Sequence, residues 1–207
     1  MKKIIPLLAV LTVILMPFDA LAKKSSSNAQ ADIQKAEEYL RNLTTAKADF
    51  IQRAHNGARL SGTFYLDRPG RLRFEYNEVE DFIVADGFFI YFFDSELREQ
   101  TNAPIGQTLA DFLLRKDLTL TGDIQVQEIG QESGLKTYLL AQSDDLAAGS
   151  VKLFFTKVPF ALKKWQVTDA AGMTTEIELK NMETDIKLTN SLFGFIHPDK
   201  KKQSYNE

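Results

Sequence analysis

Alternating apolar and polar positions run through most of the chain and predict a mainly β protein. Residues 59–76 are the clearest case, because a three-residue turn with Gly70 in the left-handed conformation aligns Leu66 with Leu72. A one-residue slip would exchange the two faces of this hairpin, so the pattern specifies its register. The predicted apolar face consists of Phe64, Leu66, Leu72, Phe74 and Tyr76.

A second hairpin is predicted on either side of Asp86-Gly87, a dipeptide typical of two-residue type I′ turns. That turn pairs Val84 with Phe89 and makes both faces of the hairpin apolar. One face consists of Phe82, Val84, Phe89, Tyr91 and Phe93, and the other of Ile83, Ala85, Phe88, Ile90 and Phe92. Each face needs a cover of protein or ligand. The pattern leaves open whether the second face lies beneath another element or forms a docking surface.

A third hairpin is predicted over residues 163–181, around a loop at residues 169–173, with Trp165 opposite Ile177. Its reverse face carries lysine, glutamine and glutamate side chains, as expected of a solvated surface. Further strands are predicted at residues 48–54, 124–131, 136–141 and 151–156. Together these elements predict a large antiparallel sheet with one apolar face.

Two segments have the spacing of amphipathic helices, residues 30–43 and residues 104–115. Proline at position 104 suits the first turn of the second helix. The chain has 15 Phe, 6 Tyr and 1 Trp, and two helices can cover only part of the apolar face of so aromatic a sheet. This mismatch favours a hydrophobic cavity over a fully packed core. The predicted apolar faces are Ile33, Ala36, Leu40 and Leu43 in the first helix, and Ile105, Leu109, Phe112 and Leu113 in the second.

Residues 1–22 have the features of a cleavable signal peptide, and we expect residues 23–207 to form a single domain. Two lysines precede an apolar run over residues 4–18, and Ala20-Leu21-Ala22 supplies the small residues that a signal peptidase requires. The apolar run is shorter than a membrane span. We therefore expect export to the periplasm. The chain contains no cysteine, so we expect no lipid on an N-terminal cysteine.

The residue types that commonly carry catalysis form no known motif. No cysteine is present, and the two histidines, His55 and His197, are solitary, so we expect no metal site. Gly-x-Ser-x-Gly, His-Glu-x-x-His and phosphate-binding glycine-loop motifs are absent from the sequence. We therefore expect no cofactor and no enzymatic activity, which disfavours a hydrolase. A formal net charge of −3 disfavours a nucleic-acid partner.

One string of residues between two predicted strands is distinctive: arginine, proline and glycine, then a basic residue, any residue, arginine and an aromatic residue, over residues 68–74. Phe50 with Gln52 precedes it, and Asp86-Gly87 with an aromatic strand follows it. In these features the chain resembles the periplasmic carriers of outer-membrane lipoproteins, the LolA-type chaperones. Phe74 stands where many members have Trp.

The resemblance implies a mainly β (α+β) fold: a curved, incomplete antiparallel β-barrel with a short helical lid over a hydrophobic cavity. The residues expected to line an acyl cavity are Phe64, Leu66, Leu72, Phe74, Tyr76, Phe82, Val84, Phe89, Tyr91 and Trp165. The residues expected to gate the lid are Leu109, Phe112, Leu113 and Arg68, which stands at the family's Arg-Pro position.

The resemblance also implies a function and a set of partners. We expect a monomeric chaperone that takes acylated lipoproteins from an inner-membrane ATP-driven exporter and passes them to an outer-membrane lipoprotein receptor. A lipid- or lipoprotein-sensing regulatory domain of the same fold is the alternative. Such sensors usually carry a second domain or a membrane anchor, neither of which is expected here.

Overall fold

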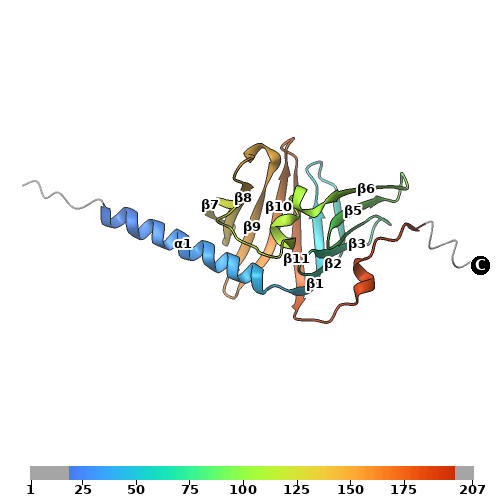
Figure 1. The fold of residues 1–207 in the computed structure, drawn as a ribbon, viewed down its shortest axis with the longest axis horizontal. Coiled ribbons are helices and arrows are strands. Elements are labelled where there is room, and N and C mark those ends of the chain that lie inside the picture. The colour runs from blue at the N-terminus through green and yellow to red at the C-terminus, as the bar shows by residue number, and fades with distance from the viewer. Residues whose placement is uncertain (1–18, 199–207) are drawn as a thin grey trace, which may run out of the picture.

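The computed structural model describes residues 19–198, so the predicted signal peptide, residues 1–22, lies largely outside the described residues. Within them, Figure 1 shows one large, open antiparallel sheet and few helices, which confirms the predicted fold class. The strands are β1 (Thr45–Arg53), β2 (Arg59–Asp67), β3 (Arg71–Tyr76), β4 (Phe82–Asp86), β5 (Phe89–Asp94), β6 (Glu99–Pro104), β7 (Ile124–Glu132), β8 (Leu135–Gln142), β9 (Gly149–Lys157), β10 (Phe160–Asp169) and β11 (Thr174–Thr184).

The eleven strands follow the order β6-β5-β4-β3-β2-β1-β11-β10-β9-β8-β7. Except for β6 and β7, strands next to each other along the chain form antiparallel pairs, and the long-range pair β1–β11 joins the two halves. Among the described strands, β6 and β7 end the order and do not pair with each other, so the barrel is incomplete. No helix within residues 19–198 has both the length and the apolar character needed to cross a bilayer.

Two of the three predicted hairpin registers are confirmed. In β2–β3, Leu66 pairs with Leu72 across a turn in which Gly70 has a φ of +80°. In β10–β11, Trp165 pairs with Ile177. Each register places the apolar residues on one face and the charged residues on the other, which is the arrangement that the alternation favours.

The predicted β4–β5 register is wrong by two residues, because Val84 pairs with Tyr91 and not with Phe89. The side chain of Asp86 explains the longer turn. Its Oδ1 accepts hydrogen bonds from the backbone N–H groups of Phe88 and Phe89, each at 2.9 Å. These bonds stabilise a turn of more than two residues. A shift of two residues leaves each side chain on its predicted face of the hairpin.

The face of β4–β5 that meets the interior is the opposite of the predicted one. Phe74, on the concave face of β3, pairs directly with Ile83, so the odd-numbered residues of β4 share that face. Phe82 and Val84 therefore lie on the outer face, together with Phe89 and Tyr91. Phe82, Val84 and Phe93 form a separate buried cluster there, packed against Tyr91 and Phe195.

The first helix, α1 (Asp19–Asn42), begins earlier than predicted, and Figure 1 shows its first turns extending away from the sheet. Its C-terminal half packs on the concave face, where Ala36 and Leu40 are fully buried. The Tyr39 ring meets Phe155 edge to face, with ring centroids 5.4 Å apart. The predicted apolar face thus contacts the sheet.

The second predicted helix is broken. It consists of the 3-10 helix η1 (Ile105–Gln107) and the four-residue α2 (Asp111–Leu114), separated by an extended Thr108. The cause lies in the sheet: Pro104 ends β6 opposite Phe89, and the N–H of Ile105 still donates to the carbonyl of Phe88. Strand pairing therefore occupies the positions predicted for the first turn.

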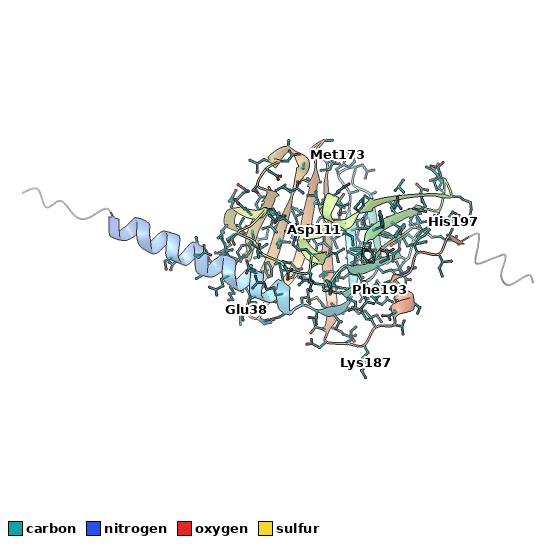
Figure 2. The ribbon with its side chains drawn as sticks, viewed as in Figure 1. Glu38, Asp111, Met173, Lys187, Phe193 and His197 are labelled. Atoms are coloured by element: carbon teal, nitrogen blue, oxygen red, sulfur yellow. The ribbon has the colours of Figure 1, made fainter. Side chains whose placement is uncertain are left out.

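The outer face of β3–β5 is covered by the C-terminal segment, which contains the 3-10 helix η3 (Asn190–Phe193). Phe193 is buried, and Figure 2 places Phe193 and His197 beside this end of the sheet. The Phe195 ring stacks on Tyr91, with ring centroids 4.9 Å apart. A third 3-10 helix, η2 (Leu146–Ala148), precedes β9.

Candidate functional site

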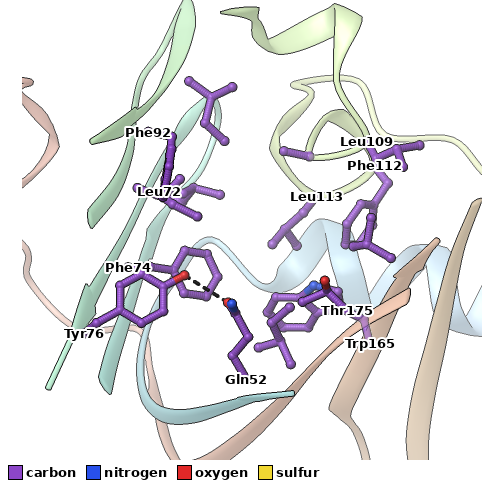
Figure 3. A pocket seen from close by; sticks show the side chains of 15 residues that line it. Gln52, Leu72, Phe74, Tyr76, Phe92, Leu109, Phe112, Leu113, Trp165 and Thr175 are labelled. Atoms are coloured by element: carbon purple, nitrogen blue, oxygen red, sulfur yellow. Dashed lines mark hydrogen bonds between the residues drawn. The ribbon is translucent and has the colours of Figure 1, made fainter. Parts of the chain in front are cut away.

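An apolar pocket of about 360 Å³ lies between the concave face of the sheet and the segment around α2 (Figure 3). This volume is near the lower end of the roughly 300–1,000 Å³ typical of ligand pockets. The pocket is lined by Gln52, Leu72, Phe74, Tyr76, Ile83, Ile90, Phe92, Leu109, Ala110, Phe112, Leu113, Trp165, Val167, Thr175 and Ile177.

The structure brings together seven of the residues predicted for the cavity and its lid. These are Leu72, Phe74, Tyr76, Trp165, Leu109, Phe112 and Leu113. Phe64 and Leu66 are on the same face but lie fully buried in the core. Phe82, Val84, Phe89 and Tyr91 do not line the pocket, because the β3–β4 register turns them to the outer face.

The reversed face of β4–β5 supplies pocket residues that the sequence analysis did not assign to the cavity. Ile83, Ile90 and Phe92 line the pocket in place of their neighbours. A pairing of Phe74 with Ile83 would have indicated this, but the pattern offered no signal for it because both hairpin faces are apolar. Gln52 and Thr175 were also missed, because polar residues do not stand out in a search for an apolar cavity.

Aromatic rings form the floor of the pocket and link it to the lid. Trp165 is central: its ring centroid lies 5.8 Å from Phe64, 6.4 Å from Phe74 and 6.4 Å from Phe112 of α2. Phe64 and Phe74 are 4.8 Å apart. Such pairs add about 0.5–1.5 kcal/mol each beyond area burial. Trp165 therefore connects the sheet to the lid through direct contact.

Arg68 joins the lid to α1. Its guanidinium donates hydrogen bonds to the carbonyl of Leu40, near the end of α1, and to the carbonyl of Arg115, just after α2, the latter at 2.8 Å. The N–H of Gly70 donates to the carbonyl of Leu114 at 2.9 Å. Burial, with a further contribution from Arg41, lowers the pKa of Arg68. The β2–β3 turn thus holds the C-terminal end of α2.

The pocket also contains a polar pair. The hydroxyl of Tyr76 donates to Oε1 of Gln52 at 2.9 Å. Burial raises the pKa of Tyr76 to about 12, helped by the negative charge of Asp81, so the hydroxyl keeps its proton. Within residues 19–198, no group of three or more histidine, aspartate or glutamate side chains is placed to hold a metal ion.

Comparisons with known proteins identify the family. Among solved structures, a LolA-superfamily protein from Nitrosomonas europaea has a TM-score of 0.46 and 14% identity, over 81% of this chain and 97% of that chain. An outer-membrane lipoprotein carrier protein from Legionella pneumophila (strain Paris) is 31% identical over 180 residues, 82% of this chain and 88% of the relative. One from Methylibium petroleiphilum is 29% identical over equal shares. Residues 41–196 match the family of the outer membrane lipoprotein carrier protein LolA, and by this match and the Legionella relative the chain belongs to that family.

Proposed function

We propose that this protein is a periplasmic carrier that binds the acyl chains of lipoproteins in its concave pocket and hands them on without a chemical step. The observation that carries the proposal is the apolar pocket beneath the lid, in a chain whose relatives are named outer-membrane lipoprotein carrier proteins. In this role the protein accepts cargo from an inner-membrane ATP-driven exporter and delivers it to an outer-membrane lipoprotein receptor.

The energetics of the cargo support a carrier with a buried apolar site. Each methylene removed from water contributes about 0.8 kcal/mol, so the acyl chains of one lipoprotein are strongly disfavoured in an aqueous compartment. A carrier must offer apolar surface to these chains, and the pocket walls supply leucine, isoleucine and aromatic side chains. Its affinity must also be low enough for release to a receptor.

The small volume of the pocket supports an opening lid. At about 360 Å³ the closed pocket is small for two or three acyl chains, whereas Leu109, Phe112 and Leu113 form one wall on a short, broken segment. Movement of that segment would enlarge the pocket without changing the sheet. We assign lid gating to these residues and to Arg68, whose bonds to Leu40 and Arg115 hold the closed state.

Binding of a purified lipoprotein tests the function. After removal of detergent, the carrier should keep a triacylated lipoprotein in solution and co-elute with it from a sizing column. The same lipoprotein without its acyl chains should not co-elute. Ile90→Arg, which introduces a charge into the pocket wall, should abolish co-elution, whereas Phe88→Arg at an 80% exposed position should not. Co-elution of the unacylated lipoprotein, or full binding by Ile90→Arg, would contradict the proposal.

A further inference from the structure

Three polar side chains gather at one end of the otherwise apolar pocket. Gln52 of β1, Tyr76 of β3 and Thr175 of β11 all line it. Gln52 pairs with Ile177, two residues from Thr175. Each of the three residues lies near the end of its strand that is farthest from the 68–70 turn. Figure 3 shows Gln52 projecting between Tyr76 on one side and Trp165 with Thr175 on the other.

Gln52 is held in place with a donor left over. Tyr76 donates to its Oε1, and the raised pKa of Tyr76 keeps this bond intact at any physiological pH. Among the described residues, Nε2 of Gln52 has no hydrogen-bond partner. It is also not one of the buried polar atoms that lack a partner, which are Nε of Arg68 and the hydroxyl of Tyr138. The Nε2 group is therefore accessible from the pocket.

An accessible donor in an apolar pocket discriminates between ligands. A purely hydrocarbon ligand would displace water from Nε2 and leave its N–H groups unpaired, which is unfavourable. A ligand with a carbonyl oxygen at this end would satisfy the donor. The opposite end, near Leu72 and Leu113, offers only apolar contacts. The pocket thus has a polar end and an apolar end.

We infer that Gln52, oriented by Tyr76, binds an ester carbonyl that links the acyl chains of the cargo to its glyceryl group. The chains then enter tail first toward the Arg68 end, and the ester group stays at the Gln52 end, where the Thr175 hydroxyl is a second donor. This inference rests on the proposed function and adds to it the part of the lipid that is recognised. Gln52 and Thr175 are specificity residues for the ester linkage.

Two synthetic lipopeptides of equal chain length test the inference, one with two ester-linked acyl chains and one with two ether-linked alkyl chains. Trp165, the single tryptophan of the chain, lies in the pocket wall and reports binding by its fluorescence. The parent protein should bind the ester lipopeptide about fivefold more tightly than the ether, as expected for one hydrogen bond. Gln52→Met, which keeps the side chain's length, should lose most of this preference for the ester.

Two further variants make the result specific. Tyr76→Phe frees Gln52 from its partner and should lower the ester preference. Gln127→Met, at an exposed glutamine of β7 outside the pocket, should leave the preference unchanged. Should Gln52→Met fail to fold, as judged by thermal unfolding, Tyr76→Phe decides.

The outcomes separate this inference from the proposed function. Equal binding of both lipopeptides by the parent protein, or an unchanged preference in Gln52→Met or Tyr76→Phe, overturns the inference and leaves the carrier function in place. Failure of the parent protein to bind either lipopeptide overturns both.

Discussion

At the scale of single residues, Arg68 connects segments that are distant in the sequence. Besides its guanidinium bonds to Leu40 and Arg115, its backbone N–H donates to the carbonyl of Thr44 at 2.7 Å. Its Nε is buried and has no hydrogen-bond partner among the described residues. Burial of a charged group is costly unless hydrogen bonds compensate it, and under the proposed function these bonds to carbonyls break when the lid opens.

Arg68→Leu should leave uptake of lipoprotein largely intact and slow its transfer to receptor-bearing membranes. The reason is that charge-assisted hydrogen bonds contribute about 1.5–3 kcal/mol, and their loss shifts the lid toward the open state, in which cargo settles more deeply. Transfer of a loaded triacylated lipoprotein measures the effect. Transfer as fast as in the parent protein would mean that Arg68 stabilises the turn but has no role in gating the lid.

Gly62 shows how a single hydrogen atom in place of a side chain allows two elements to meet. A Cβ atom at this position would lie 1.9 Å from the carbonyl oxygen of Glu75 and 2.8 Å from the ring of Phe50. Both neighbours are tightly placed, one in the backbone of β3 and one in the core. Position 62 therefore excludes every residue except glycine without a shift of the sheet.

Gly62→Ala should lower the free energy of unfolding by about 3 kcal/mol, the upper part of the range for overpacking. Urea denaturation followed by tryptophan fluorescence measures the loss. Gly106→Ala is the matched control, because no atom lies within 4 Å of its added Cβ, and its stability should match that of the parent. Equal stability of the two variants would contradict the close approach.

At the scale of elements, the lid is attached unevenly. Its C-terminal end is tied to α1, where Arg41 donates to the carbonyl of Leu118 at 2.7 Å and Glu37 accepts from the N–H of Leu120 at 2.9 Å. Its middle, from Thr108 to Leu114, contains a single short helix, held by a few turn bonds, the Asp111–Arg115 ion pair and the bond from Gly70 to the carbonyl of Leu114. Movement should therefore occur about the fixed end.

Amide hydrogen exchange should be faster over residues 106–113 than over β1 and β2, because short turns open locally at low free-energy cost. An acylated lipopeptide should change exchange at this segment and leave the β10–β11 pairing unaffected. Exchange followed by mass spectrometry resolves these peptides. Strong protection of residues 106–113 with and without lipopeptide would indicate a static core.

The C-terminal segment is a second cover, on the outer face. Phe195 contacts the rings of both Tyr91 and Phe82, the latter with ring centroids 5.7 Å apart. Arg71 adds a hydrogen bond from Nη1 to Oδ1 of Asn190 at 2.8 Å and lies over the ring of Phe193. The C-terminal segment shields the cluster of Phe82, Val84 and Phe93 from solvent.

Phe195→Ala should lower the free energy of unfolding by about 1–3 kcal/mol, since it removes ring contacts with Phe82, Tyr91 and His197 and uncovers apolar surface. Binding of lipopeptide in the pocket should be unchanged, because Phe195 lies on the other face of the sheet. Phe88→Ala, at an 80% exposed ring, is the control and should cost little stability. Thermal unfolding and Trp165 fluorescence report the two properties separately. Weaker binding of lipopeptide with unchanged stability would contradict the placement of Phe195 outside the pocket.

At the scale of the whole molecule, carboxylates with lowered pKa values should make stability depend on pH, and the more buried of them are Asp86 and Glu176. Burial acts to raise the pKa of Asp86, but hydrogen bonds from Phe89, Phe88 and Tyr91 lower it by more. Burial likewise acts to raise the pKa of Glu176, and hydrogen bonds from Lys164 and Gln166 bring it below its usual value. Both groups are charged in the folded state at pH values where the unfolded chain begins to bind protons.

Because these pKa values are lower in the folded state, their stabilisation is fully present above the unfolded pKa of about 4 and is lost as the pH falls through the folded values. Urea unfolding should therefore give a constant free energy from pH 7 to about pH 5 and a declining one below about pH 4. The double variant Asp86→Asn with Glu176→Gln should decline less steeply. An equally steep decline would assign the acid sensitivity to other groups.

The local alternation of residue types was sufficient for the hairpins whose two faces differ in polarity. In residues 59–76 and 163–181, a slipped register would bury arginine, lysine or glutamate, so only one alignment satisfies both faces. The same reasoning identified Leu109, Phe112 and Leu113 as inward-facing, because their apolar side chains need cover in a broken helix as in a continuous one. The absence of the catalytic motifs named above is likewise visible in the sequence alone.

Only the tertiary structure decided which face of β4–β5 lines the pocket, because both faces are apolar and alternation has no preference between them. Alternation alone allows either Phe82 or Ile83 opposite Phe74, and the structure pairs Phe74 with Ile83, which leaves Phe82 on the other face. The C-terminal segment covers it, more than 90 residues further along the chain, through Phe195. Contacts this distant in sequence leave no local pattern, so alternation could not show which face of β4–β5 forms the pocket wall.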